Sequence, residues 1–331
     1  MRSGRIVLLL CVGVALLLLS VFASLAFGSR TIPFQVVLDT LLSGSKSSLE
    51  ELVIHERIPR TVFGLMAGAA LGVSGALMQA ITRNPIADPS VLGVNTGAAL
   101  FVVCGIAFFN IGTPSSYILF ALLGSGLTAV LVYTLGSLGQ GGTTPIKLAL
   151  AGAAVSAALS SLVSAVILPR TEVMNAFRFW QVGSISGANW EQIQIFLPVI
   201  ILGTILALLL SPGLDALALG DELATGLGAK TTLIRMVGAI TGVLLCGATT
   251  ALAGPIGFVG LMVPHTVRLI FGPSLRRVIP FSILCGSILL LFSDVLGRLI
   301  GSPSELEAGV VTAILGAPIL ILIAMKAKVK A

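Results

Sequence analysis

The sequence is dominated by runs of about twenty predominantly apolar residues, the length that one crossing of a lipid bilayer requires. The first run covers 6–27, and polar or charged residues separate it from the next. The remaining runs lie at 58–80, 90–109, 116–136, 146–168, 192–211, 232–252, 256–271, 278–299 and 306–325. The pattern predicts an all-α integral membrane protein with about ten transmembrane helices.

Charged residues are too scarce for a soluble protein. Of the 331 residues, 10% are charged and 56% are hydrophobic, whereas a soluble domain carries roughly 25% charged residues. Ten crossings take about 200 residues, which leaves short loops and predicts a single transmembrane domain over 1–331. The net charge of +6 does not indicate nucleic-acid binding, because the basic residues form no stripe beside aromatic ones.

The two ends of the chain predict its orientation. Arg2 and Arg5 lie near the start, and three lysines lie near the end at positions 326, 328 and 330. Basic residues favour the cytoplasmic side, so both termini are expected there, which requires an even number of crossings. With this layout the larger share of the 19 lysines and arginines falls on the inner side.

Three arginines fall on the predicted outer side. Arg57 and Arg60 flank Pro59, a residue that suits the first turn of a helix. Arg298 ends the ninth run, four residues after Asp294, a spacing that permits an ion pair on one helix face. From the residues alone, Arg57 and Arg60 can snorkel at the membrane interface or form a binding surface, and Arg298 can form a structural ion pair or belong to that surface.

The segment at about 212–230 is the longest loop on the predicted inner side. It is apolar and acidic, and it reads as two short helices separated at Gly220, with Asp221 available to cap the second. Such a segment can fill the groove of a partner protein, or it can be a linker that lies on the membrane.

Two stretches predict irregular backbone within the membrane region. The stretch 254–268 contains two prolines and three glycines, which indicates a broken or shortened helix. The inner loop 82–89 contains two prolines together with Asn84 and Asp88, which predicts a rigid, hydrogen-bonded turn.

No pattern in the sequence indicates an enzyme active site. Ala229 stands where a phosphate-binding loop needs glycine before its lysine. The four cysteines lie in apolar runs without a CxxC pair or a nearby histidine, which favours small buried hydrophobic residues over metal ligands. We therefore expect no metal, no cofactor and no ATP hydrolysis in this chain.

Taken together, the motifs resemble the FecCD-type permeases of iron-siderophore, haem and cobalamin ABC importers. The resemblance spans roughly 50–325. It rests on RIPRTVFGLMAGAALGVSGALMQAITRNPIADPSVLGVNTGAAL (57–100), KLALAG (147–152), FWQVGSISGANW (179–190), LGDELATGLG (219–228), GPIGFVGLMVPHTVRLIFGP (254–273), LLLFSDVLGR (289–298) and GVVTAILGAPIL (309–320). One departure is Glu307, where the family usually has proline.

The resemblance implies a type II ABC importer permease fold and a set of partners. Two permease subunits, identical or homologous, would enclose an axial path, two ATPase subunits would dock on the inner side and use ATP and Mg²⁺, and an extracytoplasmic binding protein would dock on the outer side. The bacterial cell membrane is the expected location.

The resemblance also assigns residues. It implies that the binding protein docks on Arg57, Arg60 and Arg298. It implies that 214–228 couples to the ATPase, with the candidates Leu219, Gly220, Asp221, Glu222, Leu223, Ala224 and Gly228. The candidates for the translocation path and its inner gate are Thr143, Thr144, Gln79 and Asn84.

The function implied is ATP-driven import of a ferric siderophore or of a chelate such as haem or cobalamin. The alternative is a secondary transporter driven by an ion gradient, although such proteins place ionisable residues at the bilayer midplane. A membrane enzyme would need a motif such as DDxxD, which is absent. A scaffold that transports nothing is the third alternative.

Overall fold

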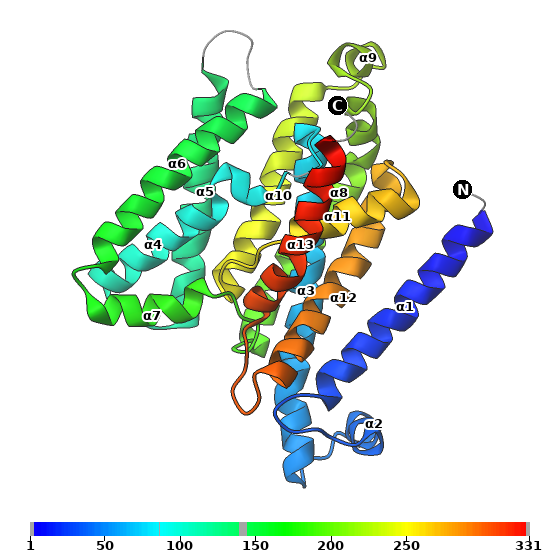
Figure 1. Ribbon diagram of the computed structural model, residues 1–331, viewed down its shortest axis with the longest axis vertical. Helices are drawn as coiled ribbons and strands as arrows, with labels where there is room; N and C mark the ends of the chain where they lie inside the picture. The colour runs from blue at the N-terminus through cyan, green and yellow to red at the C-terminus, as the bar shows by residue number, and fades with distance from the viewer. Residues whose placement is uncertain (1–2, 86, 139–143, 329–331) are drawn as a thin grey trace.

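The computed structural model describes residues 3–85, 87–138 and 144–328. Figure 1 shows most of the long helices side by side, some tilted from the long axis, with α7 lying across it. No β-strand occurs within these ranges. The elements are α1 (Ser3–Ala26), α2 (Phe34–Ser43), α3 (Leu49–Thr82), the 3-10 turn η1 (Pro89–Leu92), α4 (Val94–Phe109), α5 (Pro114–Ser137), α6 (Pro145–Ile167), α7 (Thr171–Gln181), α8 (Trp190–Leu217), α9 (Asp221–Gly226), α10 (Thr231–Ala253), α11 (Val259–Phe271), α12 (Leu275–Ile300) and α13 (Ala308–Lys328).

The predicted spans correspond to helices in the structure. Within the described residues, seven helices are long and apolar enough to cross a membrane: α1, α3, α5, α6, α8, α10 and α12. The predicted spans at 90–109, 256–271 and 306–325 appear as the shorter apolar helices α4, α11 and α13. The all-helical, multi-pass fold is therefore confirmed, and the shortened helix expected near 254–268 is α11.

The central helix is α3, which runs along the middle of the molecule beside α8, α10, α11 and α12 (Figure 1). Its small residues permit this central position. A side chain on Gly68 would overlap the carbonyl oxygen of Gly286 in α12, and one on Gly75 would overlap that of Gly260 in α11. Close backbone approach increases van der Waals contact, which lipid-embedded helices depend on because lipid is as apolar as their side chains.

Three details differ from the sequence prediction. Helix α3 begins nine residues earlier than 58, because Ser48 and Glu51 form a capping box. Helices α2 and α7 were not predicted, since both are too short to span a bilayer. Helix α8 continues through Pro212 to Leu217, so the first of the two predicted short inner helices is the last turn of α8.

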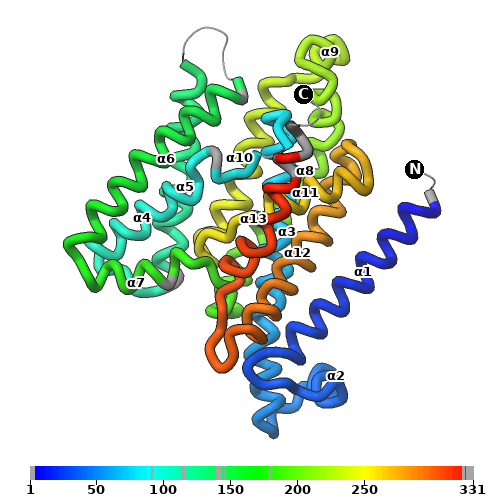
Figure 2. Tube along the Cα trace, viewed as in Figure 1, coloured from blue at the N-terminus to red at the C-terminus, as the bar shows by residue number. Residues whose placement is uncertain are grey.

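The two ends of the molecule differ in their elements. Helix α9 lies at one end, and the start of α1 and the end of α13 lie toward that end (Figure 2). The α1–α2 corner and the turn 301–307 lie at the opposite end. Helix α1 is most deeply buried at its C-terminal part, where Leu25 and Ala26 lie, and Gly13 contacts Leu284 of α12 further along it. Cys11 is exposed on its outer surface, so the prediction that all four cysteines are buried was wrong there.

Candidate functional site

The predicted docking arginines converge at the end of the molecule opposite α9, where α1, α3 and α12 meet. Arg57 of α3 is 8% exposed. Its Nη1 donates a 2.8 Å hydrogen bond to the carbonyl oxygen of Leu25, and its Nη2 donates one of 2.7 Å to that of Arg30. Arg57 therefore binds the end of α1 and the corner that follows it.

Arg298 of α12 binds the same end of α1. It is 1% exposed, and its Nη1 donates hydrogen bonds of 3.0 and 2.8 Å to the carbonyl oxygens of Ser24 and Phe27. Its Nη2 lies 2.9 Å from Asp294 Oδ2, four residues earlier on α12. The ion pair predicted for Arg298 from the spacing is confirmed. Snorkelling, which the residues suggested for Arg57, is wrong there because that side chain is buried.

Together these two arginines complete the hydrogen bonding of the α1 terminus. The last carbonyl groups of a helix have no partner within it. The carbonyl oxygens of Ala23 and Ala26 accept hydrogen bonds from backbone N–H groups. The carbonyl oxygen of Ser24 accepts one from Arg298, and that of Leu25 accepts one from Arg57. Positive charge also suits the negative end of the helix dipole. A Cβ on Gly28 would lie 2.5 Å from Nη2 of Arg57, so glycine there lets the corner close over the guanidinium groups.

Arg60 is the third arginine at this end of the molecule. We define the outer cluster as Arg57, Arg60, Arg298, Asp294 and Glu305. Nε and Nη2 of Arg60 donate to the buried Asp294, with Nη2 2.7 Å from Oδ1. Its Nη1 lies 2.7 Å from Glu305 Oε2, in the turn between α12 and α13. The sequence suggested the arginines and Asp294, but no local signal predicted Glu305 as a partner.

At the opposite end, α9 is tethered by an ion-pair network around Asp221. The carboxylate lies 2.7 Å from Nη2 of Arg235 at the start of α10, and it also pairs with Arg83 at the end of α3. Partial burial raises the pKa of Asp221, but the two guanidinium groups outweigh it and hold this pKa below its usual value. Asp221 begins α9 without capping it, so the predicted capping role was wrong.

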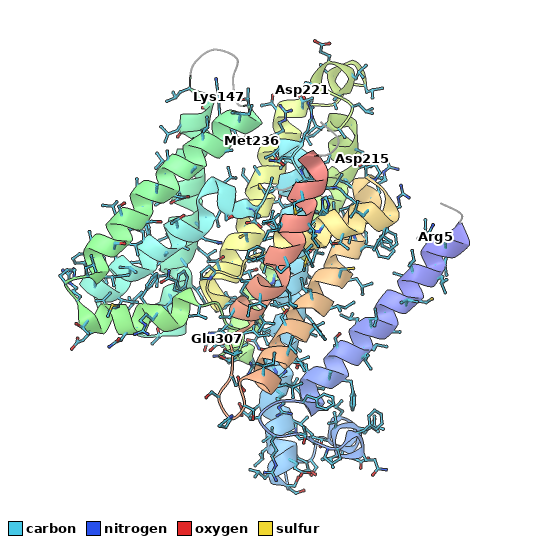
Figure 3. All side chains as sticks on the ribbon, in the orientation of Figure 1. Arg5, Lys147, Asp215, Asp221, Met236 and Glu307 are labelled. Carbon is cyan, nitrogen blue, oxygen red and sulfur yellow. The ribbon has the colours of Figure 1, made fainter. Side chains whose placement is uncertain are left out.

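A second carboxylate at this end joins the last turn of α8 to α12. Asp215 accepts hydrogen bonds of 2.8 Å from Ser274 Oγ and 2.6 Å from the backbone N–H of Leu275. Figure 3 shows Asp215 and Asp221 at the end of the molecule that α9 occupies. The loop is therefore held to α3, α10 and α12, and sequence reasoning missed Asp215 because its partners lie far along the chain.

The predicted coupling residues lie in and around α9. Leu219 and Leu223 are 60% and 63% exposed, and Leu227 beside them is 69% exposed. Ala224 is buried against the fold, and Gly220 has a φ of 113°, a conformation that favours glycine. The remaining candidates, Glu222 and Gly228, are exposed. The short helix α9, anchored on one side, therefore presents Leu223 outward, and Leu219 and Leu227 lie exposed on either side of it.

The structure describes three of the four predicted gate residues. Thr143 lies outside the described residues, and Thr144 caps α6 through the N–H of Lys147. Gln79 is 3% exposed, donates to the carbonyl oxygen of Leu261 and accepts from Arg268. Asn84 lies in the turn after α3, where its carbonyl oxygen accepts from the N–H of Ala87. Gln79 thus joins α3 to α11, and Arg268 is a partner that the sequence analysis missed.

An apolar cavity of about 400 Å³ lies between α5 and α10. Met236, labelled in Figure 3, lines it together with Val130 and Ile240, and Ser125 and Tyr133 are polar exceptions. A charged chelate would find few hydrogen-bond partners there, so the cavity is not a candidate site for a polar ligand.

Comparison with known proteins places this geometry among membrane transport components. Residues 16–326 match the sequence model of the FecCD transport family. The chain is 41% identical over 307 residues to the ferric enterobactin transport system permease protein FepD of Escherichia coli (strain K12), a match that covers 92% of this chain and 91% of that protein.

Two further similarities agree with this family match. The chain is 45% identical over 282 residues to the Fe(3+)-citrate import system permease protein YfmD of Bacillus subtilis (strain 168), covering 85% of this chain and 84% of that protein. Its fold matches a solved structure described as an inward-facing metal-chelate type ABC transporter, with a TM-score of 0.82, 29% sequence identity, and coverage of 96% of this chain and 99% of the other.

Proposed function

The chain belongs to the FecCD transport family and is a membrane-spanning permease subunit of an ABC importer, and we propose that it carries a ferric siderophore across a bacterial cell membrane. The proposed cargo is supported by the relatives, which are named for ferric enterobactin and Fe(3+)-citrate transport. Haem and cobalamin are the other chelates that an uptake experiment has to include.

The observation that carries the ATP-driven mechanism is the construction of α9. Leu223 in α9 and the flanking Leu219 and Leu227 are exposed at the end where the cytoplasmic face is expected, while Asp221 ties α9 to α3 and α10. An ATPase subunit that binds these leucines in a cleft would move the central helix α3 together with α9. Two ATPase subunits and a second permease subunit, identical or homologous, complete the proposed assembly.

The outer cluster is the proposed docking site of an extracytoplasmic binding protein. Three guanidinium groups are concentrated where α1, α3 and α12 meet, and Nη1 of Arg60 points to the carboxylate of a surface turn. Carboxylates on a binding protein would be attracted to this positive charge. Charges at the rim of an interface steer the encounter and fix its orientation more than they add affinity.

The proposed transport cycle is alternating access. The loaded binding protein docks at the outer cluster, ATP binding closes the ATPase pair, and α9 transmits this movement to α3, α10 and α12. The chelate crosses between the two permease subunits and leaves inward after hydrolysis. This chain performs no chemistry on its cargo.

The test is uptake into proteoliposomes that contain the permease, its ATPase and the loaded binding protein. Radio-iron-labelled ferric enterobactin, citrate and hydroxamate are compared with haem and cobalamin, each with and without ATP. We expect uptake of a ferric chelate that depends on ATP and persists when an ionophore collapses the ion gradients. Uptake without the ATPase subunit would support the ion-gradient alternative and contradict the proposal.

A further inference from the structure

Glu305 occupies the position at Arg60 that a carboxylate from outside would take. Nη1 of Arg60 lies 2.7 Å from Glu305 Oε2, whereas Nε and Nη2 bind Asp294. The side chain of Asp294 is 1% exposed and that of Glu305 is 32% exposed. Arg60 therefore has one buried partner that it keeps and one outward partner that can be exchanged.

The other two arginines offer no comparable exchange. Nη1 of Arg57 and Nη1 of Arg298 bind carbonyl oxygens at the end of α1. Nη2 of Arg57 binds the carbonyl oxygen of Arg30, Nη2 of Arg298 binds Asp294, and both side chains are buried. An incoming carboxylate could reach them only by breaking the hydrogen bonds that complete the α1 terminus. Arg60 can exchange Glu305 for another carboxylate while its charge stays compensated throughout, which avoids leaving a buried charge unpaired.

Glu305 is also connected to the start of α13. It lies in the turn 301–307, where the N–H of Leu306 donates a 3.2 Å hydrogen bond to the carbonyl oxygen of Gly297. The N–H of Val310 donates to the carbonyl oxygen of Glu307. A Cβ on Gly301 would lie 2.6 Å from the backbone nitrogen of Leu306, so the turn packs tightly on the end of α12. Release of Glu305 would free one attachment of this turn.

We propose that Glu305 is an internal competitor at the docking site: it holds Arg60 in the undocked permease, a carboxylate of the binding protein replaces it, and its release loosens the turn that begins α13. This inference rests on the proposed docking at the outer cluster. The contact is a single, partly exposed ion pair, and such pairs change an equilibrium constant by no more than about fivefold. Docking can therefore displace Glu305 readily.

The test measures binding of the purified cognate binding protein to the complete transporter, permease with ATPase, in lipid nanodiscs. Glu305→Gln should lower the Kd by about threefold to fivefold, because the competitor loses its charge. Glu56→Gln is the matched control, since Glu56 is an exposed carboxylate on α3 that also faces the outer side but has no ion-pair partner within the described residues. It should leave the Kd near the wild-type value. Equal Kd values for the two variants, or weaker binding of Glu305→Gln, would overturn the proposal.

Arg60→Gln distinguishes docking at Arg60 from the competitor role of Glu305. If it weakens binding while Glu305→Gln binds like the control, docking at Arg60 stands and the competitor role is wrong. If Arg60→Gln binds like the wild type, docking at Arg60 is wrong and the inference fails with it. ATP hydrolysis without binding protein provides a second readout: Glu305→Gln should raise it about twofold by shifting the population toward the released turn. Unchanged hydrolysis would contradict the connection to α13.

Discussion

Asp215, in the last turn of α8, accepts a 2.6 Å hydrogen bond from the backbone N–H of Leu275, the first residue of α12. The two residues are 60 positions apart in the sequence. The contact satisfies an N–H group that has no partner within its own helix, and it places negative charge at the positive end of α12. The loop that carries α9 is thereby fixed to a transmembrane helix.

The first prediction concerns this contact. Asp215→Ala should destabilise the permease by about 1 kcal/mol, the usual cost of losing a side chain that caps a helix. Asp215→Asn should retain most of the stability, because an amide oxygen accepts the same hydrogen bond. Thermal unfolding of the purified protein in detergent measures both. Equal midpoints for Asp215→Ala and the wild type would contradict the role of Asp215.

The second prediction concerns the tether of α9. Arg235→Gln should reduce the stimulation of ATP hydrolysis by the loaded binding protein while leaving the unfolding temperature nearly unchanged, because ion pairs at an exposed surface contribute little to stability. The matched control is Arg276→Gln, which removes an exposed arginine at the same end of the molecule. The assignment fails if stimulation is the same in both variants.

The third prediction concerns the exposed leucines. Leu223→Ser should weaken copurification of the ATPase subunits by removing apolar contact area of the kind a partner groove buries. Leu42→Ser is the control, since Leu42 is equally apolar and 79% exposed, but it lies on α2 at the opposite end. Loss of ATPase from both variants would point to a general folding defect instead.

The fourth prediction concerns the buried charge of the outer cluster. Arg298→Gln should destabilise the fold by about 3 kcal/mol or more, because it removes a partner of the buried Asp294 and weakens the cap of α1. Arg30→Gln removes the same charge from an exposed side chain and should change stability by less than about 0.5 kcal/mol. Thermal unfolding of the purified protein measures the stability of both variants. Similar midpoints for the two would show that Arg298 does not stabilise the fold.

The fifth prediction concerns packing of the central helix. Gly68→Ala should destabilise the permease, since its Cβ would overlap the carbonyl oxygen of Gly286 and backbone cannot easily move aside. Gly126→Ala, in α5, meets open space and should stabilise its helix by about 0.5 to 1 kcal/mol. Opposite shifts of the unfolding temperature are expected, and a stabilising Gly68→Ala would contradict the close contact of α3 and α12.

Hydrophobic length and helix signals were sufficient to predict most of the fold. The ten apolar runs match α1, α3 to α6, α8 and α10 to α13, because lipid requires each crossing to be apolar and to satisfy its own backbone hydrogen bonds. The ion pair of Asp294 and Arg298 was also predictable, since the two residues lie one helical turn apart.

What the sequence by itself determined is therefore local: where the chain is apolar for the length of a bilayer, where prolines and glycines shorten a helix, and which neighbours share a helix face. Only the tertiary structure decided that Arg57 and Arg298 complete the end of α1, that Glu305 meets Arg60 and that Asp221 joins α3 to α10. The physical reason is that these contacts join residues from different helices. Which helices meet depends on how the small-residue faces of the whole bundle pack, and no single stretch of sequence contains that information.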